Sequence, residues 1–64
     1  MPFVEIKMWK GRTKGTRKKM IEKVTDAVAE TIECPKEAVQ VVVFEVEKDD
    51  WAIGGQLCSE RKPG

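Results

Sequence analysis

The second residue of the chain is a proline, and this position could do chemistry directly. Pro2 follows the initiator Met1, which is normally removed when the next residue is small. Removal would expose a secondary amine at the start of an apolar segment. An α-amino group has a pKa of about 7.7–8.0, and burial near an arginine lowers that pKa because it disfavours the charged form. Such a base suits proton transfer, although proline is also tolerated simply as the first residue of a strand.

Other common catalytic templates are absent from the sequence. The chain has no histidine, which excludes Ser-His and Cys-His pairs. It also has no P-loop and no G-x-G-x-x-G motif. Its two cysteines, Cys34 and Cys58, form no C-x-x-C motif, and a zinc site would need more sulfur ligands than they supply. We therefore expect no metal and no cofactor, and reduced thiols in a cytoplasmic protein.

The composition also limits the partners of the protein. Charged residues make up 36% of the chain, but the formal net charge is only +1, so nothing draws it as a whole to nucleic acid or membrane. No apolar run approaches the roughly 20 residues of a membrane span, and Glu5 and Lys7 interrupt any signal-peptide core. The basic residues between 7 and 19 favour a solvated surface that steers anionic substrates. We expect no nucleic acid and no membrane among the partners.

Two strands and a hairpin are expected to position these residues. Residues 2–9 alternate between an apolar and a largely polar face, which is typical of a strand. Residues 39–46 are nearly all β-branched or aromatic, which predicts a second strand with both faces covered. Residues 51–57 are expected to form a loop entering a short hairpin, in which Gly54 and Gly55 can adopt positive φ.

A helix is expected between the two strands. Gly11 ends the alternating pattern, and the polar loop after it offers Thr13 or Thr16 as an N-cap. From about residue 17 to 33 the apolar residues recur with helical spacing. Pro35 then ends the helix, because the residue before a proline avoids the α region, and it suits the first position of a short helical turn.

This order of elements defines the fold class. A strand, a helix and a second strand make a right-handed β-α-β crossover with parallel strands, so we predict one α+β domain over residues 1–64 with a short C-terminal hairpin. One helix covers only one face of the sheet. Because a single core below about 70–80 residues rarely stabilises a fold by more than about 3–5 kcal/mol, the uncovered face predicts a homo-oligomer.

The features follow one another in a specific order: Pro2 heads a strand, Gly11-Arg12 precedes an amphipathic helix, Pro35 precedes a β-branched strand, and an aromatic residue precedes Ile53-Gly54-Gly55. Over nearly the whole chain this order resembles the 4-oxalocrotonate tautomerase family. The resemblance implies a protomer that dimerises into a four-stranded sheet, with three dimers commonly making a hexamer. It also implies an isomerase that moves protons between the enol and keto forms of small anionic 2-oxo acids, such as 2-hydroxymuconate.

The resemblance also assigns roles to individual residues. Pro2 corresponds to the catalytic base, and Trp51 to the aromatic wall of the substrate pocket. Arg12 corresponds to an arginine that binds a substrate carboxylate, a task for which the planar, always charged guanidinium is suited. Gln40 stands where the best-known members carry a second arginine. A glutamine donates a hydrogen bond without charge, so a substrate other than the dicarboxylate, such as an aryl enolpyruvate, is an equal alternative.

Two other functions fit the sequence. The first is haloacrylate dehalogenase or hydratase chemistry of the same superfamily, in which a protonated Pro2 acts as an acid and Glu45 or Glu47 activates water. The second is a non-catalytic oligomeric binding module that uses the basic edge as its contact surface. Halide release would identify the former, and a retained Met1 would favour the latter.

Overall fold

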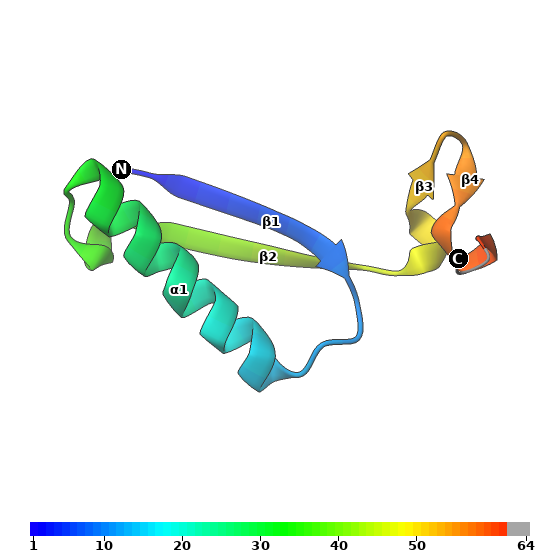
Figure 1. Ribbon diagram of the computed structural model, residues 1–64, viewed down its shortest axis with the longest axis horizontal. Helices are drawn as coiled ribbons and strands as arrows, with labels where there is room; N and C mark the ends of the chain where they lie inside the picture. The colour runs from blue at the N-terminus through cyan, green and yellow to red at the C-terminus, as the bar shows by residue number, and fades with distance from the viewer. Residues whose placement is uncertain (62–64) are drawn as a thin grey trace.

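Two parallel strands form the sheet of the protein. A computed structural model describes residues 1–61. In it, β1 (Phe3–Trp9) pairs with β2 (Gln40–Val46) in a register that runs from Phe3 opposite Gln40 to Trp9 opposite Val46. Figure 1 shows the two strands side by side, with the chain's N-terminus at the end where β1 begins. The predicted parallel β-α-β arrangement is therefore confirmed, with strand limits within one residue of those expected.

The helix α1 (Lys14–Ile32) connects the two strands. It begins three residues before the predicted start at residue 17, so that boundary was wrong, whereas Thr13, one of the two predicted N-caps, is confirmed as the cap. The reason is the cap: the Thr13 hydroxyl accepts a hydrogen bond from the Thr16 N–H at 3.1 Å, which satisfies a free backbone donor of the first turn before any apolar residue appears. The helix ends at Glu33, whose left-handed φ of 54° closes the last turn.

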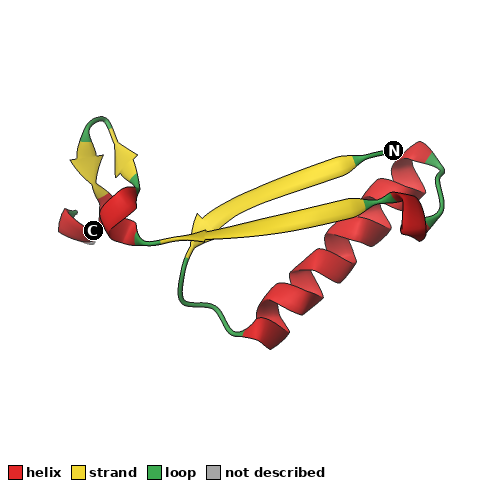
Figure 2. Cartoon of the chain, turned by 180° about the vertical axis from the view of Figure 1, so that it is seen from behind, coloured by secondary structure: helices red, strands yellow, loops and turns green. Residues whose placement is uncertain are grey.

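Only one face of the sheet is covered within a single chain. Figure 2 shows α1 lying along one side of β1 and β2, with nothing on the other side. Burial alternates along both strands accordingly, and the half-buried side chains on the helix side include Val4, Ile6, Val41 and Val43. Among the described residues, Ala29 and Cys58 alone are buried. The strand at 40–46, predicted to be covered on both faces, is covered on one.

The uncovered side of the sheet is here called the open face and consists of Phe3, Glu5, Lys7, Trp9, Gln40, Val42 and Phe44. Its apolar members are large and exposed: Phe3 is 56% accessible and Phe44 43%. Several large exposed apolar side chains on one face favour an interaction site over a solvated exterior.

The C-terminal part lies beyond the end of the sheet. After a 3₁₀ turn at Lys48–Asp50, β3 (Ala52–Ile53) and β4 (Gln56–Leu57) form the predicted hairpin, with Gly54 and Gly55 at positive φ in its turn. In Figure 1 this hairpin projects away from α1, at the end of the sheet opposite the N-terminus. None of the helices in the described part of the chain combines the length and apolar character needed to span a membrane.

Candidate active site

Pro2 lies directly before β1, and it is half-buried. Its carbonyl oxygen accepts a hydrogen bond from the Gln40 N–H at 3.1 Å, which fixes the first residues of the chain against the start of β2. Met1, by contrast, is 89% exposed. The residue predicted to be a base is therefore held in place by the sheet, while the residue that blocks its nitrogen is accessible.

Gln40 lies beside this end of β1. It is the register partner of Phe3, and both residues are exposed on the open face. The sequence placed Gln40 in the substrate site only through the family resemblance. The structure brings Gln40 and Pro2 to the same end of the sheet, which is compatible with that assignment.

Arg12 and Trp51 lie at the other end of the sheet. Arg12 is exposed in the loop that leaves β1, and this loop is tied to the end of β2 by a hydrogen bond from the Lys10 N–H to the Val46 carbonyl at 2.9 Å. Trp51 follows the 3₁₀ turn after β2. Both therefore lie beyond the carboxyl ends of the parallel strands.

One chain does not bring the four predicted residues together. Seven residues of β1 separate Pro2 from the loop of Arg12, and a strand of that length spans about 20 Å. Pro2 and Gln40 lie at one end of the sheet, and Arg12 and Trp51 lie beyond the other end. A site containing all four residues must therefore be made between chains.

Trp51 has an aromatic neighbour that the sequence analysis did not pair with it. The rings of Trp9 and Trp51 meet edge to face, with centroids 6.1 Å apart and planes at 80°, a favourable geometry for two aromatic quadrupoles. The ammonium of Lys48 lies 4.7 Å from the Trp9 ring centroid, within reach of a cation–π interaction. The result is an aromatic surface at the exit of β1, in which Trp51 is half-buried and Trp9 exposed.

Two further residues hold the loop of Arg12. The Arg17 guanidinium donates to the Arg12 carbonyl at 2.6 Å and to the Glu45 carboxylate at 3.3 Å. A signal for this contact exists in the sequence. Arg17 stands three and four residues before Met20 and Ile21, on the apolar stripe of the helix, and Glu45 alternates with Val41 and Val43 on the strand face that meets it.

The acidic residues that dehalogenase or hydratase chemistry needs are already engaged in ion pairs. Glu45 pairs with Arg17, and Glu47 pairs with Lys10 at 3.3 Å. In this arrangement each carboxylate has a protein cation as its partner. Among the described residues, no group of three His, Cys, Asp or Glu side chains is placed to hold a metal ion, and both cysteines are free thiols.

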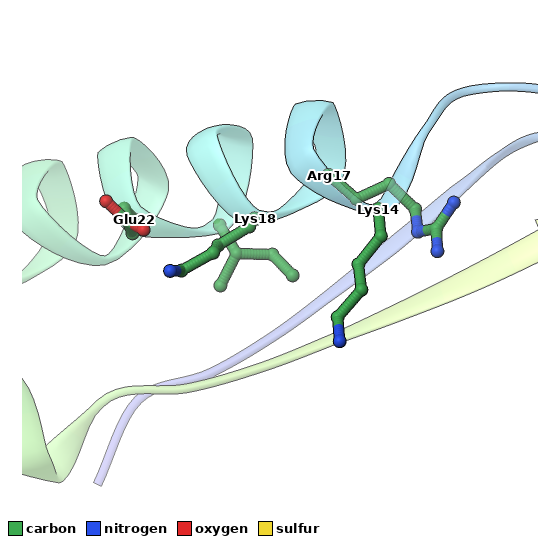
Figure 3. A pocket seen from close by; sticks show the side chains of 5 residues that line it. Lys14, Arg17, Lys18 and Glu22 are labelled. Carbon is green, nitrogen blue, oxygen red and sulfur yellow. The ribbon is translucent and has the colours of Figure 1, made fainter.

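A hollow of about 290 Å³ lies against the first half of α1 and is lined by Lys14, Arg17, Lys18, Ile21 and Glu22. Figure 3 shows these side chains projecting from one side of the helix, with the Arg17 guanidinium at the opposite end of the group from Glu22. None of the four predicted site residues lines it.

Comparisons with known proteins agree with this architecture. The family model described as "Tautomerase enzyme" matches residues 2–61. A protein of Bacillus subtilis named 2-hydroxymuconate tautomerase is 40% identical over 94% of this chain and 97% of its own length. The crystal structure of YwhB, a homologue of 4-oxalocrotonate tautomerase, has a TM-score of 0.90 at 38% identity, over 95% of this chain and all of that one. A heterohexameric 4-oxalocrotonate tautomerase from Chloroflexus aurantiacus shares the fold, with a TM-score of 0.91 at 24% identity over 97% of this chain and all of that one.

Proposed function

Since the chain belongs to the tautomerase family, we propose that it is a cofactor-independent keto–enol tautomerase of unsaturated 2-oxo acids. In this proposal the amine of Pro2 is the general base after Met1 has been removed. The observation that carries the proposal is the setting of Pro2, half-buried at the head of β1 and fixed there by the hydrogen bond from Gln40. The name of the Bacillus subtilis relative supports 2-hydroxymuconate as the first substrate to test.

The reaction requires only the movement of a proton. The neutral Pro2 nitrogen takes the proton of the enol hydroxyl, and the electron pair of that O–H bond becomes part of the new carbonyl group. The conjugated double bonds shift, and a carbon atom takes the same proton from the protonated amine. The base is regenerated and no redox partner is needed, as expected for general acid–base catalysis.

The other three residues have binding roles in this proposal. The Arg12 guanidinium anchors the substrate carboxylate, for which its fork of N–H donors is matched. Trp51, packed against Trp9, supplies an apolar wall that keeps the amine neutral by disfavouring its charged form. Gln40 donates a neutral hydrogen bond to the 2-oxo group as charge develops there.

Because these residues lie at opposite ends of one sheet, we further propose that the active protein is a homo-oligomer in which neighbouring chains complete each site. The exposed open face supports this assembly. A dimer with a four-stranded sheet, and three such dimers in a hexamer, is the arrangement that we propose. The heterohexameric relative supports an assembly of six chains.

Replacing Pro2 with alanine tests the proposal. A positioned general base contributes about 10²–10⁴-fold, so Pro2→Ala should lower kcat/KM for ketonisation of 2-hydroxymuconate and phenylenolpyruvate by at least about a hundredfold. Absorbance follows both reactions, and intact mass must first show that Met1 has been removed. A Pro2→Ala protein that is as active as the parent would contradict the mechanism. Absence of turnover of both enols by trimmed, folded parent protein would contradict the proposed function.

A further inference from the structure

We propose that Arg17 is a positioning residue for the loop that carries Arg12, and that Glu45 holds Arg17 in place. This inference rests on the proposed function in one respect, the assignment of Arg12 as the anchor of the substrate carboxylate. Neither Arg17 nor Glu45 has a place in the proposed proton transfer. Their contacts join three parts of the chain: the start of α1, the loop after β1 and the end of β2.

The geometry of the Arg17 side chain carries the inference. One nitrogen of its guanidinium lies 2.6 Å from the Arg12 carbonyl oxygen and 3.3 Å from a Glu45 carboxylate oxygen. The side chains of Arg17 and Glu45 are 26% and 28% exposed, so water only partly screens their attraction. The backbone N–H of Arg17 also donates to the Thr13 carbonyl at 3.1 Å. The carbonyl groups of Arg12 and Thr13 are therefore both tied to Arg17.

Helix stability does not explain why a cation stands at this position. The first turn of α1 contains no acidic residue, although the positive end of the helix dipole favours acidic side chains there. The ion pair with Glu45 offsets this disadvantage. Figure 3 shows the Arg17 side chain reaching along the helix to the end of the labelled group, away from Glu22.

A tethered loop matters because Arg12 itself has little support. Its side chain is exposed, and the preceding residue, Gly11, has a φ of 137° that is accessible mainly to glycine. Carboxylate recognition by a guanidinium depends on the direction of its donors. Without the Arg17 side chain, the loop would keep the contacts at its two ends, which are the Lys10 hydrogen bond and ion pair at its start and the Thr13 cap at its end.

The expected effect is on substrate binding. A carboxylate anchor acts equally in the ground state and the transition state, so loosening it raises KM and leaves kcat nearly unchanged. We expect Arg17→Met to raise KM for phenylenolpyruvate about tenfold, with kcat changed by less than about threefold. Arg17→Lys, which keeps the charge but not the planar fork, should give an intermediate KM. If Arg17→Met impairs folding, Glu45→Gln is the second variant to measure, and it should also raise KM.

A double-mutant cycle shows whether Arg17 acts through Arg12. In an Arg12→Ala background, Arg17→Met should change kcat/KM by less than about twofold, because the group it positions is already absent. Lys23→Met is the matched control: it removes the same charge from an exposed position of the same helix. It should leave KM at the parent value. Additive losses in the cycle, or an equal rise in KM from Lys23→Met, would overturn the inference.

Hydrogen–deuterium exchange separates this inference from the proposed function. In Arg17→Met the amides of residues 10–16 should exchange at least about tenfold faster than in the parent and in Lys23→Met. This readout does not require turnover, so it applies even if the parent converts neither enol. Unchanged exchange in residues 10–16 would overturn the positioning role. If the parent converts neither enol but exchange in Arg17→Met is faster, the positioning role is supported and only the proposed function is contradicted.

Discussion

Gln40 is the residue that sets the expected choice between substrates. It lies at the same end of the sheet as Pro2 and is exposed on the open face, at a position where the family resemblance implies an arginine. An amide can donate to a developing oxyanion but adds no charge. In this chain, Arg12 is therefore the one candidate anchor with a full charge among the four predicted site residues, which suits a substrate with a single carboxylate.

Replacing Gln40 with arginine should shift this preference. We expect Gln40→Arg to raise kcat/KM for the dicarboxylate 2-hydroxymuconate by about tenfold or more relative to phenylenolpyruvate, since a charged donor is worth more than a neutral one at a carboxylate. The measurement is the ratio of the two kcat/KM values. Gln40→Met is the matched control, which removes the donor without adding charge and should lower both values. An identical change for both substrates in Gln40→Arg would show that residue 40 does not contact the second carboxylate.

At the scale of elements, an ion pair fastens the 3₁₀ turn at Lys36–Ala38 to α1. The Lys36 ammonium lies 2.9 Å from the Asp26 carboxylate, and this hydrogen bond, together with the charge of Asp26, raises the pKa of Lys36 above 10.5. A raised pKa means that the pair's contribution to stability is fully present below 10.5 and is lost as pH rises through the folded-state pKa. Because both side chains are well exposed, that contribution is small.

Asp26→Asn should therefore return the pKa of Lys36 toward its ordinary value. An NMR titration of the Lys36 side chain measures this directly. Glu37→Gln is the comparison, because Glu37 raises the pKa of Lys36 only through its charge and by less than Asp26 does. Glu37→Gln should therefore lower the pKa of Lys36 by less than Asp26→Asn. If Asp26→Asn leaves the titration of Lys36 unchanged, the ion pair does not persist in solution.

The elements themselves were largely predictable from periodicity. Alternation identified β1, the run of β-branched and aromatic residues identified β2, and paired glycines identified the hairpin turn, because each pattern reflects a local requirement of the backbone. Thr13 was one of the two predicted N-caps, but the start of α1 was placed at residue 17 because the polar residues 14–16 do not show the apolar periodicity. The contact between Arg17 and Glu45 was missed because it depends on how the helix lies across the strands. The structure of one chain does not bring the four predicted site residues together, since the parallel strands place them at opposite ends of the sheet.

The dimensions of the whole molecule indicate that one chain is an incomplete folding unit. Its accessible surface is 5225 Å², whereas a folded monomer of 7.3 kDa exposes about 4,200 Å². Its radius of gyration is 14.9 Å, against about 11 Å for a compact chain of this length. The excess surface of about 1,000 Å² is comparable to the roughly 800 Å² that each partner buries in a stable interface. Assembly and activity should therefore be lost together.

Placing a charge on the open face tests this dependence. Phe44→Glu replaces a side chain that is 43% exposed in one chain and that lies away from the segments of Pro2 and Arg12. If the open face is buried between chains, the change removes about 1.5–3 kcal/mol of apolar burial per copy and adds a carboxylate that must be desolvated. Light scattering after size exclusion should then show smaller species, with kcat/KM reduced at least about tenfold because sites lose residues supplied by a neighbour.

Ala27→Glu is the control: it adds the same charge to an exposed position of α1 and should leave mass and activity unchanged. A monomeric Phe44→Glu protein with full activity would mean that one chain holds a complete site. The proposed sharing of residues between chains would then be wrong.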